Sequence, residues 1–212
     1  MKDWNTYFFP QEVMEQAEAI RNCTEELKGQ IENIADICRN VRKIHIVGSG
    51  DCYFISLAAA EAFRQLTGTE AMGYEAYDYF LEKPEVNPET MVILFSSSGK
   101  SLYVRKALDY VKECQGISVG VTNHKESPLG MESSEVLLTA AIGVSRTFPT
   151  KTTTSSLALM YSLAFELAKE KGKIMEEERV NLQREIREAV PRMIERIYTE
   201  EKEKIQQSAQ SF

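Results

Sequence analysis

The chain has 212 residues, of which 43% are hydrophobic and 27% charged, and its formal net charge is −7 at pH 7. This length suits a single domain of ordinary size, and the composition excludes a disordered or collagen-like chain. The acidic balance argues against a surface that binds nucleic acid or an anionic membrane. No apolar run approaches the ~18–20 residues of a membrane span.

The cysteines and the N-terminal segment bear on the compartment. Residues 1–10 lack the basic end and long apolar stretch of a signal peptide. The four cysteines (Cys23, Cys38, Cys52 and Cys114) form no CxxC pair, and only two histidines accompany them. We therefore expect a cytoplasmic protein with reduced thiols, no metal site and no cofactor.

The hydrophobic pattern changes along the chain. Through residues 13–38 apolar residues recur at intervals of three and four, which predicts helix. Short apolar runs then predict strands at residues 43–47, 71–74, 91–95, 117–122 and 135–139. The stretches between them predict helices at residues 52–66, 101–114 and 152–169.

Strands that alternate with helices form right-handed βαβ units. We therefore predict an α/β fold, a three-layer αβα sandwich with a flavodoxin-like five-stranded parallel sheet. A helical segment (residues 1–42) precedes this sheet domain (43–170), and a charged helical segment (171–212) follows it. Pro191 can open or kink a helix there, and the thin apolar stripe of that segment fits either packing on the sheet domain or a linker role.

The strongest candidate site follows the predicted strand at residues 91–95. Ser96, Ser97, Ser98, Gly99 and Ser101 lie between that strand and a helix. Backbone N–H groups, serine hydroxyls and the helix dipole can converge there on a phosphate. The loop is no Walker A motif, because it has only one glycine, and an ordinary serine helix cap is the plain alternative.

A second polar loop follows the first predicted strand. Gly48 and Gly50 begin it like a GxGxxG motif, but Tyr53 stands where the third glycine belongs. This partial motif leaves a nicotinamide-dependent oxidoreductase open as a weak alternative. Asp51 and Cys52 open the next helix, a position that would lower the pKa of the Cys52 thiol.

Residues 143–154 form the third polar segment, rich in threonine and ending at a helix start. Thr150 and Lys151 could contact a phosphate or sugar oxygen there, whereas ion pairs at the surface would equally explain Arg146 and Lys151. His45 lies inside a strand and is expected to be structural. His124 follows a strand end and is the better candidate for ligand contact.

Together these loops resemble the sugar isomerase (SIS) domain family of phosphosugar-binding proteins, over residues 44–167. The Ser-x-Ser-Gly-x-[Ser/Thr] phosphate loop of the family matches residues 96–101, and its Thr-Lys element matches Thr150 and Lys151. The first loop of the family falls on residues 48–52, where Asp51 and Cys52 depart from the commoner hydroxyl residues. The resemblance implies phosphate contacts from the serine loop and sugar contacts from Gly50, Asp51, Cys52, Thr150 and Lys151.

Within the family, the chain looks most like the first half of double-domain proteins. These include the isomerase part of glucosamine-6-phosphate synthase, fructosamine-6-phosphate deglycases and amino-sugar-phosphate deaminases. The resemblance implies a hexose or amino-hexose 6-phosphate ligand and a homodimer or a partner SIS domain that supplies the acid/base residues. Residues 171–212 could lead into that second domain, or the chain could be one half of a split pair or a free-standing binding domain. A non-catalytic domain that senses sugar phosphates is the alternative.

Overall fold

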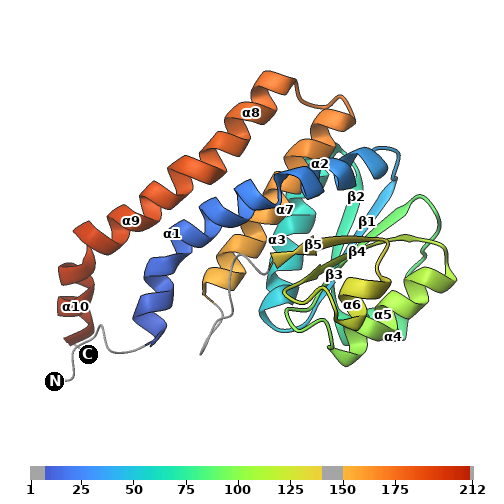
Figure 1. Cartoon of the computed structure of the whole chain (residues 1–212), viewed down its shortest axis with the longest axis horizontal. Coiled ribbons are helices and arrows are strands. Elements are labelled where there is room, and N and C mark those ends of the chain that lie inside the picture. Colours follow the sequence, from blue (N-terminus) through green and yellow to red (C-terminus); the bar gives the residue numbers. More distant parts are fainter. Residues whose placement is uncertain (1–7, 140–149, 211–212) are drawn as a thin grey trace.

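The computed structural model describes residues 8–139 and 150–210 as a five-stranded parallel sheet between helices (Figure 1). The strands are β1 (Lys43–Gly48), β2 (Glu70–Glu75), β3 (Thr90–Phe95), β4 (Ile117–Thr122) and β5 (Glu135–Leu138). The helices that belong to the sheet domain are α2 (Lys28–Ile37), α3 (Asp51–Thr67), α4 (Ala76–Glu82), α5 (Leu102–Glu113), α6 (Pro128–Glu132) and α7 (Lys151–Glu170). Outside it lie α1 (Phe8–Glu26), α8 (Glu176–Arg184), α9 (Val190–Glu200) and α10 (Lys202–Gln210).

The strands follow the order β2-β1-β3-β4-β5, and every neighbouring pair is parallel. This order confirms the predicted flavodoxin-like α/β fold. The chain runs from β1 outward to β2, and then returns to the other side of β1 for β3. The connections that leave β1 and β3 therefore run in opposite directions along the sheet. The topological switch point of the sheet lies between these two strands.

Every residue of the central strand β3 is buried, because helices cover both faces of the sheet. Alternate residues point to opposite layers, so Ile93 joins the core formed with α2, α3 and α7, and Leu94 joins the core formed with α4, α5 and α6. A continuous apolar run such as residues 91–95 is the sequence signature of such a strand. The five predicted strands are confirmed, each within one residue at either end.

Two short helices were not among the predictions. In α4, the Glu75 carboxylate caps the helix by accepting a hydrogen bond from the Tyr77 amide at 2.6 Å. In α6, Ser127 accepts from the Gly130 amide at 3.1 Å, and Pro128 occupies the first turn. Helices of 7 and 5 residues are too short to show a helical period in the sequence.

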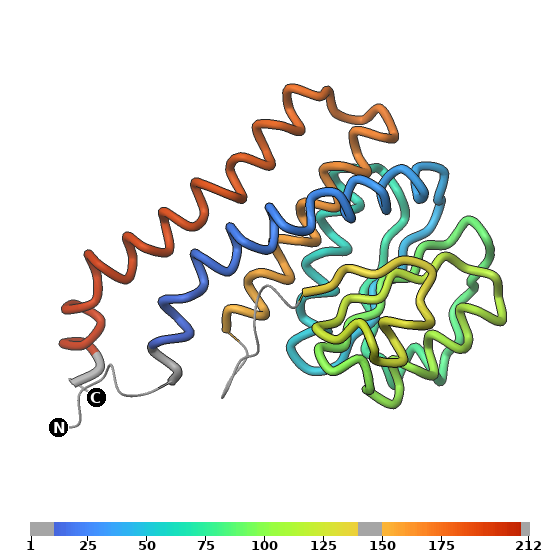
Figure 2. Tube along the Cα trace, in the orientation of Figure 1, coloured from blue at the N-terminus to red at the C-terminus, as the bar shows by residue number. Residues whose placement is uncertain are grey.

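The C-terminal helices pack beside the sheet domain and do not extend its layers (Figures 1 and 2). Helix α8 packs on α7, and α9 packs along α1. A π-helical turn, Glu185–Ala189, joins α8 to α9 just before Pro191. Because proline has no amide N–H to donate, a local change in hydrogen-bond spacing is expected there.

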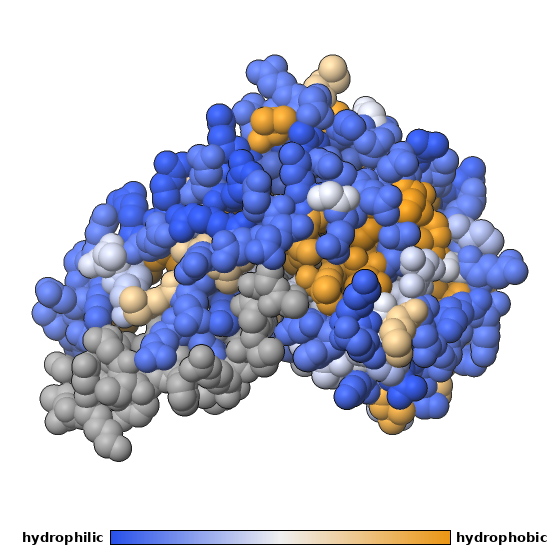
Figure 3. All heavy atoms as spheres, in the orientation of Figure 1, coloured by the Kyte–Doolittle hydropathy of each residue, from blue (hydrophilic) through white to orange (hydrophobic). Residues whose placement is uncertain are grey.

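The apolar stripe predicted for this segment is only partly covered. Leu182, Ile186, Val190 and Ile194 are half-buried, whereas Ile197 keeps 56% of its surface exposed. The rest of α8 and α9 is largely hydrophilic on the face shown in Figure 3. Among the described residues, no helix has the length and apolarity needed to cross a membrane.

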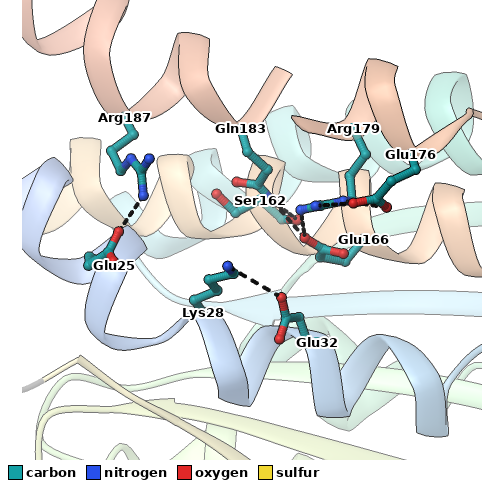
Figure 4. A network of polar contacts seen from close by, with 9 residues as sticks. All are labelled: Glu25, Lys28, Glu32, Ser162, Glu166, Glu176, Arg179, Gln183 and Arg187. Atoms are coloured by element: carbon teal, nitrogen blue, oxygen red, sulfur yellow. Dashed lines mark hydrogen bonds and ion pairs between the residues drawn. The ribbon is translucent and has the colours of Figure 1, made fainter. Parts of the chain in front are cut away.

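A buried ion pair fastens α8 to the domain (Figure 4). The Arg179 guanidinium donates to Glu166 at 2.7 Å and to Glu176 at 2.6 Å, and the Gln183 amide donates to Glu166 at 3.3 Å. Glu166 lies on α7 and is only 4% exposed. Burial raises the pKa of Glu166, and the attraction of Arg179 only partly offsets that effect. The pair therefore fixes the direction in which the C-terminal helices leave α7.

Candidate functional site

Two of the polar segments singled out in the sequence, and the described end of the third (residues 150–154), gather at one edge of the sheet. The β1–α3 loop and the β3–α5 loop leave the carboxyl ends of β1 and β3, the strands on either side of the switch point. The N-terminus of α7 meets the N-terminus of α3, because the Thr153 hydroxyl donates to the Asp51 carboxylate at 3.0 Å. In open α/β sheets, ligands bind in the crevice at this edge.

The serine loop is held in shape by its own hydroxyl groups. The Ser96 and Ser101 hydroxyl oxygens lie 2.9 Å apart, and the Ser101 amide donates to Ser96 Oγ at 3.4 Å. A tight turn is closed by the Gly99 amide, which donates to the Ser96 carbonyl at 2.9 Å. Ser96 is buried, whereas Ser97 and Ser98 are exposed and face solvent.

Helix α5 begins without a side-chain cap. Ser101 is the N-cap residue, yet within the described part of the chain its hydroxyl makes no capping hydrogen bond and pairs with Ser96 instead. The amide groups of the first turn of α5 thus have no side-chain oxygen as acceptor there. This geometry disagrees with the interpretation of the serines as an ordinary helix cap and leaves the helix N-terminus available to an anion.

Gly99 is required by both its backbone and its neighbours. Its φ is +64°, and a Cβ atom at this position would lie 1.8 Å from the Ser127 hydroxyl oxygen. The loop also rests on the next strand connection, because the Asn123 amide donates to the Ser97 carbonyl at 3.0 Å. The loop is therefore rigidly placed before any ligand arrives, which lowers the entropic cost of binding.

The β1–α3 loop also depends on glycine. A Cβ atom on Gly48 would lie 2.6 Å from the Cβ atom of Cys52, and Gly50 has φ +62°. Cys52 is half-buried at the start of α3. Burial, aided by the charge of Asp51, raises the pKa of its thiol to about 12. The predicted lowering of the Cys52 pKa by the helix N-terminus is therefore wrong, because desolvation disfavours the thiolate.

The start of α7 is tied to α1 by two carboxylates that the sequence did not reveal. The Thr150 hydroxyl donates to Glu12 at 3.3 Å, and the Lys151 ammonium pairs with Glu15 at 2.5 Å. Glu12 is only 2% exposed. The spacing of Glu12 and Glu15 shows that they share a helix face, but not which partner that face meets. Residues 143–149 of the third segment, Arg146 among them, lie outside the described residues.

The two histidines differ as the sequence predicts. His45 is 3% exposed, and its Nδ1 lies 3.0 Å from the Tyr79 hydroxyl oxygen in the core. Burial lowers the pKa of His45 to about 4, so it is neutral at pH 7. His124 is exposed and lines an open pocket of about 220 Å³ with Ser98 and Lys100 of the serine loop. In the described ranges, no group of three acidic, histidine or cysteine side chains is placed to hold a metal ion.

A model of the SIS domain family matches residues 37–166 of the chain. The chain belongs to the SIS domain family. This assignment confirms the resemblance seen in the sequence. The strand order also differs from the 3-2-1-4-5-6 order of the dinucleotide-binding fold, which removes support from the nicotinamide alternative.

Curated relatives are longer than this chain. The glutamine–fructose-6-phosphate aminotransferase (isomerizing) of Neisseria meningitidis is 30% identical over 194 residues, a match that spans 86% of this chain and 31% of the relative. The chain therefore spans about a third of the length of the curated relatives that it matches.

Solved structures share the fold. The C-terminal domain of glucosamine-fructose-6-phosphate aminotransferase from Francisella tularensis superposes with a TM-score of 0.78 at 20% identity, over 88% of this chain and 54% of that one. A protein of Escherichia coli CFT073, solved in complex with a ligand, gives a TM-score of 0.65 at 17% identity. That match covers 85% of this chain and 98% of the other.

Proposed function

We propose that this chain is the phosphosugar-binding SIS domain of a sugar-phosphate isomerase, fructosamine-6-phosphate deglycase or amino-sugar-phosphate deaminase. The observation that carries the proposal is the uncapped N-terminus of α5, preceded by a preformed serine loop at the switch point of the sheet. Residues 43–170 form the binding domain in this proposal. The relatives reported above are named as phosphosugar enzymes, which agrees with this proposal.

The phosphate binds at the β3–α5 loop. Amide groups of the first turn of α5 and the hydroxyls of Ser98 and Ser101 donate to its oxygens, and the helix dipole favours its negative charge. Gly50, Asp51 and Cys52 of the β1–α3 loop line the sugar, and Thr150 and Lys151 close the site from α7. Because β1 and β3 are neighbouring strands, ~4.8 Å apart, one hexose phosphate can span both loops.

Proton transfer is completed by a second SIS domain or by a second copy of the chain. His45, one of the two histidines, is committed to the core by its contact with Tyr79 and cannot reach a substrate. Met193 and Ile197 of α9 are 61% and 56% exposed, and an apolar surface of this kind fits a partner. Light scattering of the purified chain is expected to show a dimer. A monomer at all concentrations would leave the partner domain as the source of the acid/base residues.

The proposal is tested by calorimetric titration with fructose 6-phosphate. We expect binding to the unmodified chain and a loss of about tenfold or more in Ser98→Ala, since that hydroxyl donates to a charged oxygen. Ser134→Ala is the matched control, because Ser134 precedes β5 at the opposite edge of the sheet. Equal affinity in Ser98→Ala and Ser134→Ala would place the phosphate elsewhere.

Turnover separates an enzyme from a sensor. A chain that binds fructose 6-phosphate but shows no turnover, alone or with a partner SIS domain, would be a sensing domain. Turnover that appears only when the partner is added would identify the chain as half of an active site.

A further inference from the structure

Asp51 places a carboxylate at the sugar end of the site. It begins α3 directly after the β1–α3 loop and is half-buried. Within residues 8–139 and 150–210, no lysine or arginine forms an ion pair with this carboxylate, and the Thr153 hydroxyl at 3.0 Å is its hydrogen-bond donor. A half-buried carboxylate with one neutral donor has capacity for a further, charged donor.

The Asp51 carboxylate also contacts a second helix. The helix dipole favours an acidic residue in the first turn of α3, and this effect requires no hydrogen bond to that turn. The N-cap residue of α3 is Gly50, and the carboxylate of Asp51, the next residue, reaches across to α7. The carboxylate therefore joins the two elements that border the sugar end of the site.

The lysine beside this position is already neutralised. Lys151 pairs with Glu15 at 2.5 Å, and its side chain is only 14% exposed. A ligand therefore meets Lys151 as part of an ion pair, whereas no lysine or arginine of the described residues pairs with Asp51. The two ends of the site thus differ in electrostatic character, with N–H and hydroxyl donors at the β3–α5 loop and a carboxylate at the β1–α3 loop.

We propose that Asp51 is the residue that selects a phosphosugar carrying a protonated amino group. This inference rests on the proposed function, because it assumes that the phosphate lies at the serine loop. The ammonium group then donates to Asp51 while the phosphate accepts from the N-terminus of α5. A neutral phosphosugar gains no charged partner at Asp51, and a ligand with a second anionic group is repelled there.

The test compares two pairs of ligands, and the members of each pair differ only in the amino group. Glucosamine 6-phosphate and glucose 6-phosphate differ in the substituent at C2, and a second pair, 1-amino-1-deoxyfructose 6-phosphate and fructose 6-phosphate, differs at C1. By calorimetric titration we expect the unmodified chain to bind the amino member of at least one pair about tenfold more tightly, as a charged hydrogen bond implies. Asp51→Asn removes the charge, keeps an acceptor for Thr153, and is expected to abolish this preference.

Controls separate charge from fold. Asp109→Asn removes an exposed carboxylate from α5 and is expected to keep the full preference. Asp51→Thr is a second variant with a hydroxyl at this position and is expected to behave like Asp51→Asn, and thermal unfolding checks that each variant is folded. If the amino and neutral ligands of both pairs bind equally, or if the preference survives in both Asp51 variants, the role of Asp51 is refuted while phosphate binding stands. If none of the four ligands binds, the proposed function itself falls.

Discussion

The hydroxyl oxygens of Ser96 and Ser101 lie 2.9 Å apart, across the loop that precedes α5. This contact withdraws the N-cap serine from its usual partner and leaves the first turn of α5 open. Ser96 is buried and organises the loop, whereas Ser98 and Ser101 can face a ligand. Within this short motif, Ser96 therefore shapes the loop, whereas Ser98 and Ser101 are the serines that can contact the phosphate.

Ser96→Ala is expected to weaken phosphosugar binding through Ser101. Without its partner, the Ser101 hydroxyl is free to turn back and cap α5, where it competes with the phosphate for the same amide groups. We expect a loss of about tenfold in affinity for fructose 6-phosphate, measured by calorimetry. The double variant Ser96→Ala/Ser101→Ala removes this competing hydroxyl. If its loss of binding free energy equals the sum of the losses in the two single variants, the two serines act independently.

Gly99→Ala is expected to disrupt the loop. The substitution forces a side chain onto a residue with φ +64° and drives its Cβ atom to 1.8 Å from the Ser127 hydroxyl oxygen. We expect a loss of about 2 kcal/mol or more in the free energy of unfolding, together with loss of fructose 6-phosphate binding.

The matched control is Gly29→Ala in α2. Among the described residues, nothing lies within 4 Å of a Cβ atom at Gly29. Alanine is favoured over glycine in a helix, so a gain of about 0.5–1 kcal/mol is expected in urea unfolding. The interpretation of Gly99 would be contradicted by unfolding curves in which both substitutions are neutral.

Arg179→Ala is expected to be the most destabilising change at the C-terminal helices. It leaves the Glu166 carboxylate, 4% exposed, without its guanidinium partner (Figure 4). Removing one partner of a buried pair costs about 3–5 kcal/mol. Arg196→Ala is the control, because Arg196 and Glu200 are exposed on α9 and such pairs contribute less than about 1 kcal/mol. If both variants lose the same free energy of unfolding in urea, the buried pair contributes no more to stability than the exposed pair.

His45 is expected to make the protein less stable in mild acid. Its pKa in the folded state is about 4, below the value of 6.5 for a free histidine, so the unfolded chain binds more protons between these two pH values. Stability therefore falls as the pH drops from about 6.5 toward 4, by about 3 kcal/mol in total for this residue.

The contribution of His45 is isolated by comparison with His45→Gln. This variant keeps a hydrogen-bonding group for Tyr79 but does not titrate, so its stability is expected to change less between pH 7 and pH 4 than that of the unmodified chain. His124→Gln serves as the exposed control. Parallel stability profiles for the unmodified chain and His45→Gln would contradict the burial of a neutral imidazole.

The fold could be predicted because its signals are local and strong. A run such as residues 91–95, apolar throughout and followed by small polar residues, has few other structural solutions. The serine loop could be located for the same reason, since residue type and position at a strand end determine its chemistry. The contacts between distant segments could not be predicted, because Glu12 and Glu15 acquire their partners only when α1 packs against α7.

The prediction of a lowered pKa for Cys52 failed for the same reason, because it depended on contacts between distant segments. Its place at a helix start is visible in the sequence, and that place alone favours a lowered pKa. The neighbours that bury the thiol come from the fold, and burial raises its pKa to about 12. A local electrostatic rule thus failed where desolvation by distant residues dominates.

The most direct test of the account is to follow the backbone amide resonances of the ¹⁵N-labelled chain during titration with fructose 6-phosphate. The account predicts that the largest changes fall on residues 97–104, in the serine loop and the first turn of α5, with smaller changes on residues 50–53 of the β1–α3 loop. The same titration with inorganic phosphate is expected to move the first group alone. Changes confined to other parts of the sheet domain, or no changes at millimolar ligand, would contradict a phosphosugar site at this edge of the sheet.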